Sequence, residues 1–154
     1  MTDVKPENPR AYPDRPYVGV GVVIFRGDQV LLAQRGKPPR EIFWSIPGGA
    51  QELDETVREA GLREVKEETD LEVEILGLID VVDSITRDPD GRVEFHYTLV
   101  DFFAEWRSGE AVAGDDCPEV CWADLDDLER YGLREATLEI INLAAQKRRA
   151  LHAG

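Results

Sequence analysis

The chain has 154 residues, 32 acidic and 18 basic, which gives a formal net charge of −14 at pH 7. This length suits one domain with a full hydrophobic core, and so acidic a surface excludes a protein that coats a nucleic acid polymer, which would be basic. No apolar run approaches the ~18 residues of a membrane span, the N-terminus lacks an apolar signal segment, and the two cysteines favour a reducing cytoplasm.

The first sixteen residues are polar and hold four of the nine prolines. Such a composition does not favour regular secondary structure. We therefore predict an N-terminal arm over residues 1–16 and a single domain over residues 17–154. Two interpretations of the arm stay open: a disordered segment, or an arm that packs on a second subunit, which would make the protein a homodimer.

Three β-rich segments follow the arm. Residues 17–25 are apolar on both faces, which is typical of a buried central strand. A hairpin turn at residues 26–29 leads into a returning strand at residues 30–34. Residues 43–46 form a third, short strand.

Two side chains next to these strands are candidates for contacts with a substrate. Arg35 opens a loop that carries three cations in six residues, which could meet a phosphate or ribose or could be simple surface charge. Trp44 could stack on a nucleobase or could belong to the core. We place both among the candidate substrate-binding residues and keep both alternatives.

The most informative stretch runs from Gly49 to Leu71 and reads GAQELDETVREAGLREVKEETDL. Within it, Thr56 and Glu59 form an S/T-x-x-E capping box, the signature of a helix start. We therefore predict a helix over residues 57–69.

Three carboxylates of this helix gather on one side. At ~100° per residue, Glu64 and Glu68 lie within ~40° of each other, and Glu67 lies about 60° from Glu64. Such like charges repel, so their grouping favours a bound divalent cation such as Mg2+, which prefers carboxylate oxygens. Arg63 can hold a neighbouring carboxylate by bidentate bonding. The turn before the helix contains glycines that permit a positive φ and close backbone approach to a ligand, and a carbonyl of this turn could complete a metal shell.

The rest of the chain alternates strands and one further helix. Residues 72–82 and 93–106 predict two antiparallel strands joined by a turn. Residues 111–122 predict an acidic loop and a short strand, and residues 134–150 a second long helix. Strands that flank two well-separated helices favour the α/β class, with an α/β/α sandwich around a central mixed sheet.

The stretch from Gly49 to Leu71 closely resembles the Nudix box of the Nudix hydrolases, the MutT-type pyrophosphatases, and a weaker resemblance extends over residues 17–128. The resemblance implies the same sandwich fold and hydrolysis of a nucleoside diphosphate derivative with Mg2+ or Mn2+. It also implies that Glu64, Glu67 and Glu68 bind metal or act as the base. The carbonyl of Gly48 would bind metal as well. Arg63 and Glu55 would orient the other groups.

Two positions depart from the family pattern. Asp70 stands where the family usually has Gly, and Asp tolerates the left-handed cap less well. Gly61 stands where a helix former is common, at a cost of roughly 1 kcal/mol against Ala. Both departures bear on stability more than on chemistry, because every acidic position of the box is kept.

Members of this family often carry a further metal-binding or basic carboxylate shortly before a late Trp. Asp116 is our first match for that catalytic position and Glu119 the second, and Glu119 also joins the candidate substrate-binding residues. Surface acidity is the alternative for both.

By the same resemblance, the short ADP-ribose pyrophosphatases are the nearest group, so we expect ADP-ribose to be cleaved to AMP and ribose 5-phosphate. A MutT-like (deoxy)nucleoside triphosphate pyrophosphatase is the alternative within the class. A catalytically silent nucleotide sensor on the same fold is the alternative from another class. A calcium-binding scaffold is disfavoured, because the sequence has no D-x-D-x-D-G loop.

Overall fold

The computed structural model describes residues 8–36, 41–114 and 117–153. Its elements follow one another along the chain as β1 (Tyr17–Arg26), β2 (Gln29–Arg35), β3 (Phe43–Ser45), β4 (Gly48–Ala50), α1 (Val57–Thr69), β5 (Glu72–Arg87), β6 (Val93–Ser108), β7 (Val120–Asp124) and α2 (Glu135–Ala153), with two 3-10 turns (Leu125–Asp127 and Glu129–Tyr131) before α2. Neither α-helix in this part of the chain has the length and apolar character to cross a membrane.

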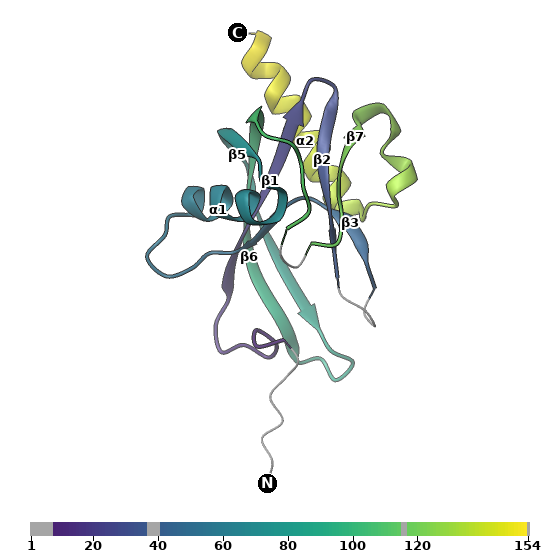
Figure 1. The fold of residues 1–154 in the computed structure, drawn as a ribbon. Helices are drawn as coiled ribbons and strands as arrows, with labels where there is room; N and C mark the ends of the chain where they lie inside the picture. Colours follow the sequence, from purple (N-terminus) through teal and green to yellow (C-terminus); the bar gives the residue numbers. More distant parts are fainter. Residues whose placement is uncertain (1–7, 37–40, 115–116, 154) are drawn as a thin grey trace.

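A single mixed sheet organises these elements (Figure 1). Its main path is β3-β2-β1-β6-β5, while β4 pairs with β1 and β7 pairs with β2. The β1–β6 pair is parallel and the other pairs are antiparallel. The predicted α/β class with a mixed sheet is therefore confirmed.

Strand β1 is the centre of the sheet, and both of its faces are buried. Val22 and Ile24 point into a core cluster with Val65 of α1. Val23 points the other way, into a cluster with Ile141 of α2. The two helices therefore cover opposite faces of the sheet, as the predicted sandwich requires.

The glycine-rich segment before α1 differs from the prediction. We expected a turn with positive φ, but residues 48–50 form the short strand β4, and neither Gly48 nor Gly49 has a positive φ. Glycine is needed at position 48 because a Cβ there would overlap the carbonyl oxygen of Val20 on the paired strand β1. The expected close approach to a ligand stays a prediction. Close backbone approach, not an unusual dihedral angle, is what glycine allows here.

The strands β5 and β6 are longer than predicted. Each has 16 residues, and they pair along almost their whole length with four register shifts. The predicted turn starts only after Arg87, where Asp88 accepts hydrogen bonds from the backbone of Asp90 and Arg92.

The described part of the N-terminal segment contacts its own chain near that turn. The backbone N–H of Tyr12 donates to the carbonyl of Glu94 at 2.7 Å, and its hydroxyl donates to Asp88 at 2.9 Å. The guanidinium of Arg92 lies 4.5 Å from the Tyr12 ring centroid. The division into an arm and a domain at residue 16 stays a prediction.

Candidate functional site

Helix α1 begins and ends at the predicted residues. Thr56 and Glu59 form the reciprocal capping box, with hydrogen bonds of 3.1 and 3.0 Å. At the other end, Asp70 adopts the left-handed conformation, with φ 60°, and its side chain lies 3.3 Å from the ammonium of Lys66. Gly61 is explained by packing, since a Cβ there would lie 3.2 Å from Val22 of β1. Gly61 therefore lets the helix lie close to the sheet, while Asp70 ends the helix in the conformation that glycine usually supplies.

Arg63 connects the helix to the segment that precedes it. Its Nε and Nη2 donate to both carboxylate oxygens of Glu55, at 3.0 and 2.8 Å, and Nη2 also donates to the carbonyl of Ala50 at 3.0 Å. Its Nη1 donates to Glu64 at 2.8 Å and to Glu67 at 3.2 Å. The hydrogen bonds that Arg63 donates to Glu55 raise the pKa of Arg63 and lower the pKa of Glu55.

We expect Arg63→Lys to lower the free energy of unfolding by about 1–2 kcal/mol, because a lysine ammonium cannot reproduce the two-oxygen contact with Glu55 while reaching Ala50 and Glu64. The measurement is urea unfolding at fixed ionic strength. Arg107→Lys is the matched control, since Arg107 contacts only the exposed carboxylate of Glu74 among the described side chains and such surface pairs are worth little. Equal losses in the two variants would contradict a special role for Arg63.

Glu68 is the most deeply placed of the three carboxylates. Its Oε2 accepts a hydrogen bond from the backbone N–H of Gly48 at 3.1 Å. Burial, opposed by the charge of Arg35 and reinforced by the charges of Glu64 and Glu67, raises the pKa of Glu68 to about 7. Burial is the main cause of this raised pKa, and the two neighbouring carboxylates add to it.

Glu64 lies directly against strand β4. A Cβ on Gly49 would stand 2.5 Å from the carboxylate carbon of Glu64, so only glycine leaves room for this side chain. The carboxylate of Glu64 is 14% exposed, whereas that of Glu67 is 52% exposed. Glu64 and Glu68 are therefore partly buried beside β4, whereas Glu67 lies at the exposed edge of α1.

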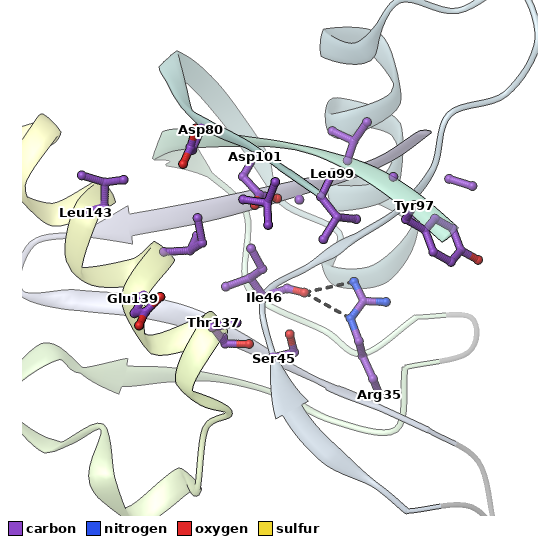
Figure 2. A pocket seen from close by; sticks show the side chains of 18 of the residues that line it. Arg35, Ser45, Ile46, Asp80, Tyr97, Leu99, Asp101, Thr137, Glu139 and Leu143 are labelled. Carbon is purple, nitrogen blue, oxygen red and sulfur yellow. Dashed lines mark hydrogen bonds between the residues drawn. The ribbon is translucent and has the colours of Figure 1, made fainter. Parts of the chain in front are cut away.

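Arg35 contacts the backbone of β4 and of the residues just before it. Its guanidinium donates to the carbonyl of Ile46 at 3.0 and 3.3 Å (Figure 2). It also donates to the carbonyl of Gly48 at 2.8 Å. The positive charge predicted to meet substrate thus orients the backbone that leads into the acidic helix. Its contact with substrate stays a prediction.

A cavity of about 620 Å3 opens beside β4, on the face of the sheet that α2 covers. Its walls come from β1, β2, β3, β4, β5, β6 and the first half of α2, and its lining includes Gly49, Arg35, Tyr97, Leu99, Asp101 and Leu143. Gly49 lines the cavity and also lies against the carboxylate of Glu64, so the acidic edge of α1 and the cavity are neighbours at β4.

Sequence reasoning missed Asp101, which lies on β6 and is only 6% exposed. Burial, together with the charge of Asp80, raises the pKa of Asp101 to about 6. The signal was present in the printed sequence, where one carboxylate interrupts the apolar run TLVDFFA. The α2 side chains that line the cavity were missed too, because that helix was interpreted as packing alone.

The remaining predicted residues lie elsewhere or outside the described part. The ring of Trp44 packs edge-on against Tyr131, with centroids 5.7 Å apart, and Trp44 does not line the cavity. Glu119 is exposed, and its carbonyl accepts from the backbone of Gln34 at 2.8 Å. Asp116 lies outside the described residues. Substrate contacts by Trp44 and Glu119 and catalysis by Asp116 stay predictions.

Comparison with known proteins gives consistent matches. A family model described as the NUDIX domain matches residues 15–144. An ADP-ribose pyrophosphatase from Methanocaldococcus jannaschii is 37% identical over 115 residues, which are 75% of this chain and 66% of that protein. An 8-oxo-dGTP diphosphatase from Proteus vulgaris is 34% identical over 94 residues, 60% of this chain and 79% of that protein. The match thus spans just under two thirds of the ADP-ribose pyrophosphatase.

A solved structure agrees with these sequences. The crystal structure of a MutT NUDIX hydrolase from Burkholderia pseudomallei superimposes with a TM-score of 0.71 at 32% identity, covering 84% of this chain and 98% of that one. The resemblance found in the sequence is confirmed by a family model that spans most of the chain. The family model over residues 15–144 and the relatives that match most of the chain show that this chain belongs to the Nudix hydrolase family.

Proposed function

We propose that this protein hydrolyses the pyrophosphate bond of a nucleoside diphosphate derivative, with ADP-ribose as its substrate and AMP and ribose 5-phosphate as its products. The observation that carries the proposal is the continuity of the site. Glu64, one of the three α1 carboxylates, lies against Gly49, which also lines a cavity of about 620 Å3, and this volume suits a small organic ligand. One end of the site can therefore serve the diphosphate and the other end the nucleoside.

The acidic end suits a divalent cation by the chemistry of its donors. Glu64, Glu67 and Glu68 would hold Mg2+ or Mn2+, and the carbonyl of Gly48 would add a fourth oxygen, which are the hard ligands that these ions prefer. Burial raises the pKa of Glu68, and the charges of Glu64 and Glu67 add to this effect; a cation bound beside these carboxylates would favour their charged forms. When bound there, it would neutralise phosphate oxygens and make an attacking water more acidic.

The side chains must rearrange to act together. In the described residues, no three acidic, histidine or cysteine side chains converge as they would around one ion. Glu64 and Glu67 face the guanidinium of Arg63, and Glu68 faces the backbone N–H of Gly48. Rotation about the side-chain bonds of α1 is enough to turn these groups outward, while Arg63 keeps its hold on Glu55.

The reaction itself needs a water, a base and a leaving group. Water would add to one phosphorus, and the bond from that phosphorus to the bridging oxygen would break, which leaves two phosphate monoesters. Glu64, or a carboxylate of the loop that precedes β7, would take the proton from the water. Arg63 would hold the segment before α1 in place through its hydrogen bonds to Glu55 and to the carbonyl of Ala50.

Two relatives favour different substrates. The name of the archaeal relative supports ADP-ribose, and the name of the Proteus vulgaris relative supports an oxidised deoxynucleoside triphosphate as the second candidate. Both substrates offer a nucleobase to the cavity and a diphosphate to the carboxylates, so the site architecture serves either. Assembly as a homodimer and a cytoplasmic location stay predictions.

We expect ADP-ribose to be hydrolysed with Mg2+ or Mn2+ and to yield AMP and ribose 5-phosphate in equal amounts. The measurement is chromatographic identification of products from a panel that includes ADP-ribose and the common and oxidised triphosphates, each with and without EDTA. Hydrolysis of triphosphates with no AMP from ADP-ribose would move the assignment to the second candidate. Turnover that persists in EDTA would contradict the metal-dependent chemistry.

A further inference from the structure

Asp101 lies in an environment that does not suit a charged side chain. It is 6% exposed, and within residues 8–36, 41–114 and 117–153 no side chain donates a hydrogen bond or ion pair to it. The hydrogen bond from the backbone N–H of Gly21 is the one contact that lowers the pKa of Asp101 against the effect of burial. On the neighbouring strand, Asp80 lies directly opposite in the register of β5 and β6, and like charges in that position destabilise a sheet.

Strand β1 is shaped around this carboxyl group. A Cβ on Gly21 would overlap Oδ1 of Asp101 and would also approach Ile46 within 2.9 Å. The missing side chain at position 21 therefore leaves the space in which the Asp101 carboxyl group lies. Asp101 in turn forms part of the cavity wall, between β1 and the first half of α2 (Figure 2). The arrangement is a built site for a polar group, in a wall that is otherwise mainly apolar.

The charges of the cavity fix how a nucleotide can enter it. Asp80 and Asp101 stand on the side of the cavity that faces away from Arg35, and they would repel a phosphate. Apolar and aromatic side chains supply the walls, among them Val82, Tyr97, Leu99 and Leu143, and they suit a planar base. The base must therefore lie toward Asp101, with the phosphates toward Gly49 and the carboxylates of α1.

We propose that Asp101 is a specificity-determining residue, whose carboxyl group accepts a hydrogen bond from the exocyclic amino group of adenine in this cavity. The proposal rests on the proposed function, because it takes the ligand to be an adenosine nucleotide. A carboxylate accepts from an amino group but repels the carbonyl oxygen that hypoxanthine carries at the same ring position. A buried polar group left without its partner discriminates strongly between two such ligands.

The test compares two mononucleotides that differ at that position. Calorimetric titration of the protein with AMP and with IMP, both in Mg2+, measures binding without any turnover. We expect AMP to bind about tenfold more tightly than IMP, as for a hydrogen bond to a charged group. In Asp101→Asn the ratio should fall to within about threefold, because an amide can present either its oxygen or its nitrogen to the base. Asp83→Asn is the matched control, since Asp83 is exposed on β5 and does not line the cavity.

The outcomes separate this inference from the proposed function. Equal binding of AMP and IMP by the native protein, or an unchanged ratio in Asp101→Asn, overturns the role of Asp101 even if ADP-ribose is hydrolysed. Loss of the ratio in Asp83→Asn as well would also overturn it. A tenfold ratio that disappears only in Asp101→Asn supports the inference even if ADP-ribose is not a substrate.

Discussion

Glu68→Gln should lower kcat for ADP-ribose by about a thousandfold while nucleotide binding stays within about tenfold of the native protein. The glutamine side chain has the same shape and can still accept the hydrogen bond from the Gly48 backbone N–H. What it lacks is the negative charge, which Glu68 would contribute to the binding of a divalent cation and thereby to the transition state. A thousandfold loss corresponds to about 4 kcal/mol of transition-state stabilisation. Steady-state kinetics and calorimetric binding of AMP measure the two quantities separately.

A matched variant distinguishes this effect from a general loss of acidic charge. Glu72 lies just beyond α1, is exposed, and contacts Lys66 at 3.0 Å. Glu72→Gln should keep kcat within about twofold, because an exposed ion pair contributes little. If Glu68→Gln retained full activity, the acidic helix would not be the catalytic element. If the native protein bound nucleotide but showed no turnover with any divalent ion, the silent sensor would replace the enzyme.

Local signals made helix α1 predictable to the residue. The capping box of Thr56 and Glu59 marks its start through two reciprocal hydrogen bonds, and such bonds depend on neighbours three residues apart. The helix end was less certain, because Asp70 had to adopt a left-handed conformation that glycine adopts more easily. Its contact with Lys66, one turn earlier, shows how an aspartate is accommodated there.

Features that depend on distant partners were not predictable. Whether Gly48–Ala50 forms a turn or a strand is decided by β1, about thirty residues earlier, which supplies the pairing backbone. The sequence shows Arg35 only as a loop cation, which could contact substrate or lie on the surface. The fold brings it to the carbonyls of Ile46 and Gly48. Local sequence carries no record of such contacts, so both needed the three-dimensional structure.

The same limit applies to the cavity end of the site. The carboxylates of α1 are neighbours in sequence, so their grouping follows from helical geometry alone. Asp101, Asp80 and Gly21 come from three different strands, and their proximity follows from the sheet order. The interrupted apolar run around Asp101 indicated an unusual residue, but not what it faces.

Asp101→Asn should raise the free energy of unfolding by about 2–3 kcal/mol at pH 7 and leave it nearly unchanged at pH 4. The pKa of Asp101 is raised from 3.8 to about 6 in the folded protein, first by burial and then by Asp80. Between these two values the folded state binds more protons than the unfolded state, so stability decreases as pH rises through that window and is constant above it. The difference between the folded and unfolded pKa values of Asp101 corresponds to about 3 kcal/mol of unfolding free energy. The charged groups that face the same cavity are Arg10, Arg35, Asp80 and Glu139.

Urea unfolding of both proteins at pH 4 and pH 7 measures this difference, and taking the variant relative to the native protein cancels the titration of the other carboxylates. Asp83→Asn should show no such pH-dependent gain, because Asp83 is exposed. A variant that is no more stable than the native protein at pH 7 would show that the Asp101 carboxylate is already well solvated in its cavity. A variant that gains stability and loses its preference for AMP over IMP would show why a costly buried charge lies at this position, since groups that serve binding often destabilise the fold that holds them.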